Sequence, residues 1–303
     1  MVLNRASALD ALRSSDLLEI GRSANQVRRN LHPENVVTYA LRGLSTSLED
    51  ARREAASRSG SGVDLSQIHD AQNVSLDDLQ TSLLNCRKQH PEVTFHNLPI
   101  SRLETVAVNT LRLTEMLQRL REAGLRTLSA NFDPLRHSAG PSDSLMTLLP
   151  TAAECDLRVS ISITVGSSES LDQRVDTIAV VRALQQESNA IHAVRVCVHH
   201  AAIPDARREE EATAVDYLKT LGVTRLFLDN IEHLQTDWSV MGPKVLELAL
   251  HFGADDAGSV PWSQAGTLEP SHHGGESELR RIIRDAGFRP VERDALFRQS
   301  LLR

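Results

Sequence analysis

Short apolar runs alternate with longer helix-like segments along most of this 303-residue chain. The clearest run, 157–165, alternates apolar and polar side chains as a strand does, and the segment that follows it, 170–187, has the apolar spacing of a helix. Strand, helix and strand in this order form right-handed units within a parallel sheet. The repetition of this unit therefore restricts the fold to the α/β class.

Eight segments are expected to be strands, separated by helices. They are 36–41, 63–68, 93–96, 125–132, 157–165, 193–198, 226–228 and 235–240. Eight parallel strands favour a (β/α)8 barrel of the TIM type, closed or partly open, over an open doubly wound sheet. No Gly-x-Gly-x-x-Gly motif follows the first strand, so a dinucleotide-binding fold loses its main sequence support.

Helix signals set the expected organisation around this barrel. Ser75 is a candidate N-cap, and Gly124 and Gly287 are candidate helix stops. We divide the chain into a helical extension over 1–35, the barrel over 36–260, and a C-terminal loop and helix over 261–303 that pack on the barrel.

Charge and composition exclude several classes of protein. The chain has 40 acidic residues against 33 lysines and arginines, a formal net charge of −7, which argues against nucleic acid or an anionic membrane as the main partner. No apolar run approaches the roughly 18–20 residues that cross a bilayer, and 1–16 lacks the pattern of a secretory signal. Three isolated cysteines are typical of a reducing compartment. We expect a soluble, cytoplasmic protein.

Several distinctive phrases occur along the chain. They are LDNI at 228–231, WSVMGPKV at 238–245, HFGADDAGS at 251–259 and LRRIIRDAGFRPVERD at 279–294, with DLLEIG at 16–21 near the start. These phrases resemble the radical S-adenosylmethionine (SAM) enzymes of the futalosine route to menaquinone, a family that includes dehypoxanthine futalosine cyclase and aminofutalosine synthase, with the FO synthase subunits as relatives. The likeness spans roughly 10–41 and 90–301, and it implies a radical-SAM-like barrel with its active site at the carboxyl ends of the strands.

The sequence departs from this family where the family binds its cofactors. The resemblance implies a 4Fe–4S cluster, held by a C-x3-C-x2-C motif after the first strand, and SAM bound to that cluster. The stretch 41–70 contains no cysteine, and its serines are poor iron ligands. The Gly-Gly segment that helps to seat SAM is also missing. We therefore expect neither cofactor, and no other metal motif is present.

Polar residues at the expected carboxyl ends of strands are the candidate site. The candidate catalytic residues are His96, His199 and Asp229. The candidate ligand-binding residues are Tyr39, Asn97, Asn131, Asp133, Thr164, His200, Asn230 and Trp238. Imidazole and carboxylate groups together are suited to proton transfer near neutral pH or to binding a divalent metal.

Two functions follow from these observations. In the first, the chain is a pseudoenzyme or accessory subunit, related to menaquinone biosynthesis, that binds a small metabolite or a radical SAM partner that holds a cluster. In the second, it is a cluster-free biosynthetic enzyme that uses the histidine and aspartate pocket for acid–base chemistry on a nucleoside-like or polar metabolite. The retained histidines favour the second function, and the loss of the cluster loop favours the first.

Overall fold

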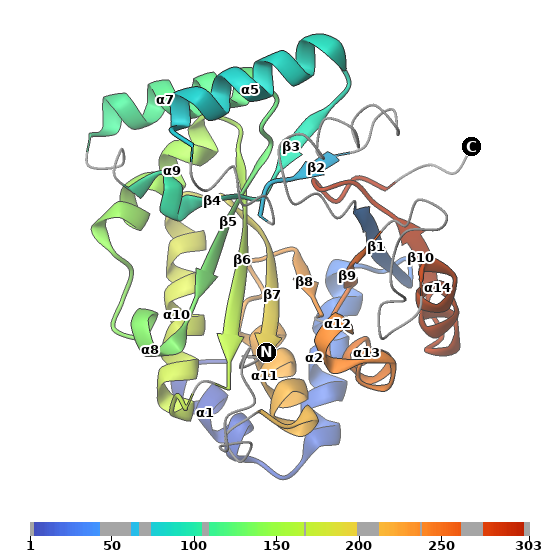
Figure 1. Ribbon diagram of the computed structural model, residues 1–303. Coiled ribbons are helices and arrows are strands. Elements are labelled where there is room, and N and C mark those ends of the chain that lie inside the picture. The colour runs from blue at the N-terminus through green and yellow to red at the C-terminus, as the bar shows by residue number, and fades with distance from the viewer. Residues whose placement is uncertain are drawn as a thin grey trace, which may run out of the picture.

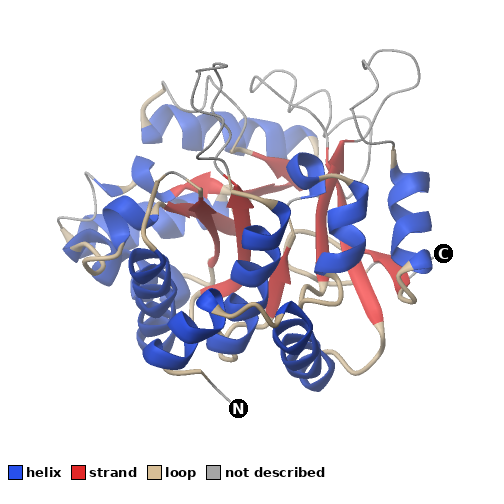
Figure 2. Ribbon diagram, turned by 90° about the horizontal axis from the view of Figure 1, so that it is seen from below, coloured by secondary structure: helices blue, strands red, loops and turns tan. Residues whose placement is uncertain are grey.

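Parallel strands form the centre of the molecule, and helices lie around the outside of them (Figure 2). The computed structural model describes residues 3–42, 62–66, 74–104, 109–166, 168–198, 212–236, 238–261 and 275–299. Within these residues the strands alternate with helices along the chain, as the sequence predicts. The expected α/β barrel-like fold is confirmed.

The strands form one large sheet and one small one. They are β1 (Val36–Arg42), β2 (Gly62–Asp64), β3 (Thr94–His96), β4 (Leu98–Pro99), β5 (Thr127–Phe132), β6 (Arg158–Val165), β7 (Ile191–Val198), β8 (His233–Gln235), β9 (Asp256–Pro261) and β10 (Arg289–Glu292). The eight-stranded sheet has the order β10-β1-β9-β8-β7-β6-β5-β4, and β2 pairs with β3. All of these pairings are parallel.

The barrel is open between its first two strands. β1 lies between β9 and β10, so the position that β2 takes in a closed barrel is occupied by β10 (Figure 1). Among the described residues, no strand pairing joins β1 to β2. The molecule is thus the partly open form of the expected barrel.

Local signals in the sequence explain where several helices begin and end. The helices are α1 (Arg5–Arg13), α2 (Leu17–Leu31), α5 (Leu76–Gln89), α7 (Thr110–Glu122), α8 (Pro134–His137), α9 (Asp143–Glu154), α10 (Leu171–Ser188), α11 (Ala214–Phe227), α12 (Trp238–Met241), α13 (Pro243–Ala249) and α14 (Glu276–Asp285), with a 3-10 turn at Ile100–Arg102. Ser75 caps α5, since its hydroxyl accepts from the backbone N–H of Asp78 at 3.1 Å. Gly124 follows α7 with φ +107°, a conformation that favours glycine.

The expectations for the last third of the barrel were partly wrong. Residues 226–228 are not a strand, because α11 continues to Phe227 and its side chains pack against α2. The seventh strand is β8, and the eighth is β9, which begins at Asp256, where the sequence analysis had no strand. Residues 238–240, expected within a strand, are helical. β10 was not expected either.

The strand β6 shows how the barrel interior becomes hollow. Its apolar side chains, Val159, Ile161 and Ile163 among them, are buried. The alternate positions, Ser160 and Ser162 among them, are only half-buried. Successive side chains of a strand point to opposite faces, so serine hydroxyls occupy a face that bulky residues fill in most such barrels. None of the described helices is long and apolar enough to cross a membrane.

Candidate functional site in the barrel interior

A cavity of about 980 Å³ occupies the barrel interior and its mouth. Residues from most of the strands line it, together with the segment that follows β10. Its wall has apolar and polar parts, and the polar residues include Asp64, His96, Asn97, Ser129, Asn131, Ser160, Ser162, Thr164, Arg195, Gln235, Ser259 and Arg298. A cavity of this size can enclose a small metabolite.

Hydrogen bonds between neighbouring strands position the polar groups of this wall. Arg195, on β7, donates to the Ser162 hydroxyl on β6 at 3.2 Å. At the mouth, the Thr164 hydroxyl donates to the Asn131 amide oxygen on β5 at 2.8 Å. The guanidinium supplies charged hydrogen-bond donors in the interior, and the carboxylates of Asp64, Glu104, Glu292 and Asp294 line the same cavity.

His96 lies at the end of β3, against β2, and it is only 4% exposed. Its Nε2 shares a hydrogen bond of 2.8 Å with the Thr94 hydroxyl, and its Nδ1 has no partner among the described residues. The close approach to β2 requires glycine, because a Cβ at Gly62 would lie 2.5 Å from the ring. An unpaired ring nitrogen next to a cavity is a position at which a ligand can bind.

Burial determines the charge of this histidine. It lowers the pKa of His96 to about 4, because the protonated ring would lose hydration, although the charge of Asp64 opposes the shift. The ring is therefore neutral at pH 7. A neutral imidazole with this pKa is a good hydrogen-bond partner but a weak base.

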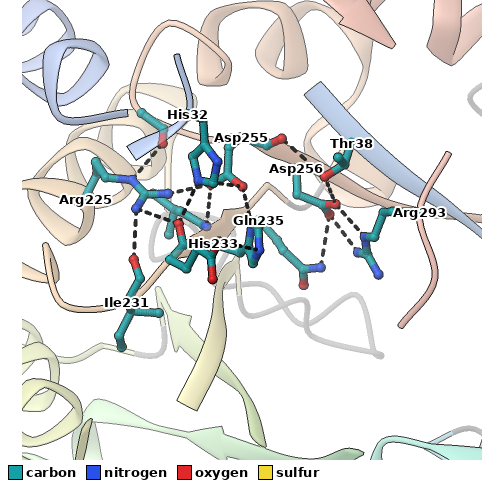
Figure 3. Close-up of polar contacts among 12 residues, drawn as sticks. His32, Thr38, Arg225, Ile231, His233, Gln235, Asp255, Asp256 and Arg293 are labelled. Carbon is teal, nitrogen blue, oxygen red and sulfur yellow. Dashed lines mark hydrogen bonds and ion pairs between the residues drawn. The ribbon is translucent and has the colours of Figure 1, made fainter. Parts of the chain in front are cut away.

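Buried ion pairs close the opposite end of the barrel, at the amino ends of β8 and β9 and next to β1 (Figure 3). Asp255 accepts hydrogen bonds from Arg225 at 2.5 Å and from the His233 Nδ1 at 2.7 Å, and the His32 Nε2 lies 3.4 Å away. Burial alone would raise the pKa of Asp255, but the bond from His233 and the charge of Arg225 lower it to about 2. We call Arg225, Asp255, His233 and His32 the basal network.

A second carboxylate extends this end of the barrel toward the C-terminal segment. Asp256 accepts from the Arg293 Nε at 2.7 Å, from its Nη2 at 2.9 Å, and from the Thr38 hydroxyl at 2.6 Å. Its remaining acceptor sites are filled by Gln235 and by the N–H of Gly258. The side chain is fully buried and fully paired, as a structural carboxylate is.

The residues after β10 turn inward and plug the barrel from this side. Phe297 stacks on His233 with ring centroids 3.8 Å apart, and it meets His192 edge-on at 5.4 Å. The guanidinium of Arg293 lies 4.1 Å from the centre of the same ring. We call 293–299 the tail turn. It forms the floor of the cavity.

Four of the candidate residues line the cavity together. These are His96, Asn97, Asn131 and Thr164. Asn97 also donates to the Asp64 carboxylate at 3.0 Å.

Three candidates lie elsewhere. Tyr39 is buried under α14, where its hydroxyl donates to Glu276 at 2.6 Å, and burial raises its pKa to about 12. Asp133 caps α8 through the N–H of Leu135. Trp238 is buried in the core at the start of α12.

Asp229 and Asn230 are at the other end of the barrel from the mouth. The sequence analysis placed them after a strand, but they follow the helix α11 and precede β8. Asp229 forms an ion pair with Arg182 of α10 at 2.6 Å, and Asn230 donates to the Arg182 carbonyl at 3.3 Å. They therefore do not meet His96. The remaining candidates, His199 and His200, lie outside the described residues.

The sequence analysis missed much of the cavity wall. Ser160 and Ser162 occupy the polar positions of the clearest alternating strand, a signal that points to a polar barrel interior. Arg195 is the corresponding signal on β7, where a charged residue interrupts an apolar run. The tail turn gave no such signal, because its position depends on contacts with strands far away in the sequence.

The described cysteines are spread over different elements. Cys86 lies in α5, Cys155 at the end of α9 and Cys197 on β7. Among the described residues, the one group of histidines, cysteines and acids close enough to share a metal ion is His32, His233 and Asp255. These side chains already bond to one another and to Arg225, so we interpret the group as part of the basal network.

Known proteins are similar to this chain over most of its length. Residues 171–301 match the family described as the CofH/MqnC C-terminal region. The chain is 22% identical over 333 aligned positions to cyclic dehypoxanthine futalosine synthase of Streptomyces coelicolor, covering 94% of this chain and 82% of that protein. It is 25% identical over 349 positions to aminodeoxyfutalosine synthase of the same organism, covering 97% and 90%. The resemblance seen in the sequence is thereby confirmed.

Solved structures share the fold. Methylornithine synthase superposes with a TM-score of 0.68 at 14% identity, covering 96% of this chain and 94% of that one. The FeFe-hydrogenase maturase HydG from Carboxydothermus hydrogenoformans superposes with a TM-score of 0.67, also at 14% identity, covering 98% and 78%.

Proposed function

We propose that this chain, a relative of the radical SAM enzymes of the futalosine pathway, binds a small polar metabolite inside its barrel without an iron–sulfur cluster. It would act in the cytoplasm as a pseudoenzyme or accessory subunit. The observation that carries the proposal is the polar cavity of about 980 Å³, which persists in a chain whose stretch 41–70 contains no cysteine.

The donor set does not fit a 4Fe–4S cluster. Such clusters need closely spaced thiolates, and the three cysteines of this chain lie on two helices and a strand that are far apart in sequence. Cys86 and Cys155 are also buried. We therefore assign no step to a cluster or to radical chemistry.

The cavity wall supplies what binding requires. Arg195 offers a positive charge, the serines of β5 and β6 offer hydroxyls, and the His96 Nδ1 offers an unpaired ring nitrogen. The polar residues at the mouth hold one another in place through the bond between Thr164 and Asn131. A metabolite with several hydroxyl groups would match these groups.

The second candidate, a cluster-free enzyme, is favoured by one observation. His96 lines the cavity, and its Nδ1, which has no partner among the described residues, would accept a proton from a bound ligand. Two facts give the enzymatic function less support than a function in binding alone. The pKa of His96 is about 4, so it is a poor base at neutral pH, and Asp229 lies at the other end of the barrel.

Iron and sulfide reconstitution under anaerobic conditions tests the first part of the proposal. We expect no stoichiometric iron, no broad absorbance near 400 nm and no reductive cleavage of SAM. About four irons per chain together with 5′-deoxyadenosine formation would overturn it.

Ligand binding tests the second part. Native mass spectrometry of the purified protein should detect a retained small molecule, and calorimetry with aminodeoxyfutalosine and with cyclic dehypoxanthine futalosine measures two defined probes. A probe that binds the wild type should bind His96→Gln at least about tenfold more weakly, which is about 1.4 kcal/mol. Leu135→Ala, at an exposed position outside the cavity, is the matched control and should bind as the wild type does. Turnover of a probe by the wild type that is lost in His96→Gln would favour the enzyme.

A further inference from the structure

A second cavity, of about 470 Å³, lies beneath the amino ends of β5, β6 and β7. It is at the far end of the barrel from the mouth, and Arg298 of the tail turn lines both cavities. Its wall contains Arg121, Arg126, Arg158, Arg298, Asp156, Glu232, Gln185, Asn189 and Asn230. We call it the basal arginine cavity.

Positive charge exceeds negative charge in this wall. Four arginines line the cavity against two carboxylates, in a chain whose net charge is −7. Arg121 is paired with Asp156 at 2.5 Å, and Arg298 with Asp294 at 2.6 Å.

The other two arginines have no carboxylate partner among the described residues. Arg126 donates to the carbonyl oxygens of Arg121 and Leu125, at 3.0 and 2.8 Å. Arg158 donates to the Asn189 carbonyl at 3.1 Å. Carbonyl oxygens satisfy these donors but do not neutralise the charge.

The crowding of these side chains affects the central arginine most. Burial, followed by the charges of Arg121 and Arg87, lowers the pKa of Arg126 to about 10. A bound anion would offset the repulsion between the guanidinium groups. Their planar, forked donors match the oxygens of phosphate and of carboxylate, and phosphate carries the larger negative charge.

We propose that the basal arginine cavity binds the phosphate group of a small metabolite. A volume of about 470 Å³ falls within the range of small-molecule sites, roughly 300–1,000 Å³, and exceeds what one phosphate needs. Asn230 lines this cavity, and its buried amide oxygen has no donor among the described residues. It would accept from a hydroxyl on the organic part of the ligand.

Phosphorus NMR and calorimetry test this site with defined probes. Inorganic phosphate and glycerol 3-phosphate are titrated at constant ionic strength, and glycerol and sodium chloride serve as blanks. We expect saturable binding of both phosphates, with broadening of their ³¹P lines by the protein. Tighter binding of glycerol 3-phosphate would assign the site to a phosphate ester, and equal binding would assign it to free phosphate.

Variants locate the binding. Arg126→Met should weaken phosphate binding at least tenfold, and Arg158→Gln should weaken it several-fold. Arg136→Gln is the matched control, because Arg136 is exposed on α8, beyond the other end of β5. If Arg126→Met fails to fold, Arg158→Gln carries the test. The absence of saturable binding, or equal affinity in the wild type and a folded Arg126 or Arg158 variant, would overturn the proposal.

Discussion

At one end of the barrel, beneath β1, β8 and β9, the buried charges are paired with one another, whereas the interior and the mouth keep polar groups around an open cavity. Asp255 and Asp256 have every acceptor position occupied. The His96 ring, by contrast, has a nitrogen without a partner among the described residues. Ionisable residues therefore do not by themselves identify the candidate functional site. The site is identified by an open cavity and by polar groups without a partner.

The largest expected effect tests the paired end. Asp255→Ala leaves the guanidinium of Arg225 buried without its counter-charge, and we expect a loss of about 3–5 kcal/mol in the free energy of unfolding, measured by urea denaturation. Asp285→Ala breaks an exposed pair with Arg281 and should cost about 0.5 kcal/mol or less. Similar losses in the two variants would remove the distinction between the network and an ordinary surface pair.

The pH dependence of stability tests the burial of the histidines. The pKa of His96 is about 4 in the folded protein against 6.5 in the unfolded chain, so the unfolded state binds more protons between these values. The free energy of unfolding should fall as the pH falls through this window, by about 1.4 kcal/mol per pH unit and on the order of 3 kcal/mol in all. Asp255, with a pKa of about 2 against 3.8, acts only at lower pH.

Urea denaturation between pH 3 and 8 measures this effect. In His96→Gln, the free energy of unfolding should depend less on pH between about 4 and 6.5. His192, whose pKa burial lowers to about 3, contributes in the same direction, so His192→Gln should flatten the curve as well. A stability that stays constant from pH 7 to pH 4 in the wild type would contradict the burial of both histidines.

A smaller effect is expected at the tail turn, where the two regions meet. Phe297→Ala removes the stack on His233 and the edge contact with His192, and it should cost about 1–2 kcal/mol by thermal or urea denaturation. Phe297→Leu keeps much of the volume and should lose about half as much. If both substitutions are neutral, the tail turn does not seal the barrel.

The smallest effect is expected at the mouth. Thr164→Val keeps the shape of the side chain and removes its hydrogen bond to Asn131, so the free energy of unfolding should change by about 0.5 kcal/mol. Binding of any ligand that the wild type retains should weaken at the same time, as calorimetry can measure. A large loss of stability with unchanged ligand binding would show that Thr164 has a structural role instead.

The sequence predicted the elements that have strong local signals. The strand 157–165, the cap at Ser75 and the helix stop at Gly124 are all present, because strand alternation, side-chain capping and a left-handed backbone depend on neighbouring residues. The cavity residues His96 and Thr164 were also found, because they follow or end strands that were identified correctly.

The errors occur where distant contacts determine the structure. Residues 226–228 have the composition of a short strand, but α11 is buried on almost all sides and continues to Phe227. β9 begins at Asp256, directly after Asp255, although strands contain few aspartates; Arg225 pairs with Asp255 and Arg293 with Asp256. No local sequence pattern indicates such distant ion-pair partners. Because 226–228 was predicted to be a strand, Asp229 was assigned to the carboxyl end of a strand, which is the wrong end of the barrel.

The arrangement of β1 also has a consequence for synthesis on the ribosome. Both of its neighbours, β9 and β10, come much later in the chain, and the contact between Thr38 and Asp256 joins residues 218 positions apart. While translation continues, the nascent chain has to carry this apolar strand without either of its final neighbours. Pairings of such long sequence separation form slowly and leave edges exposed to aggregation. We therefore expect ribosome-bound intermediates that end before β9 to bind chaperones through this strand.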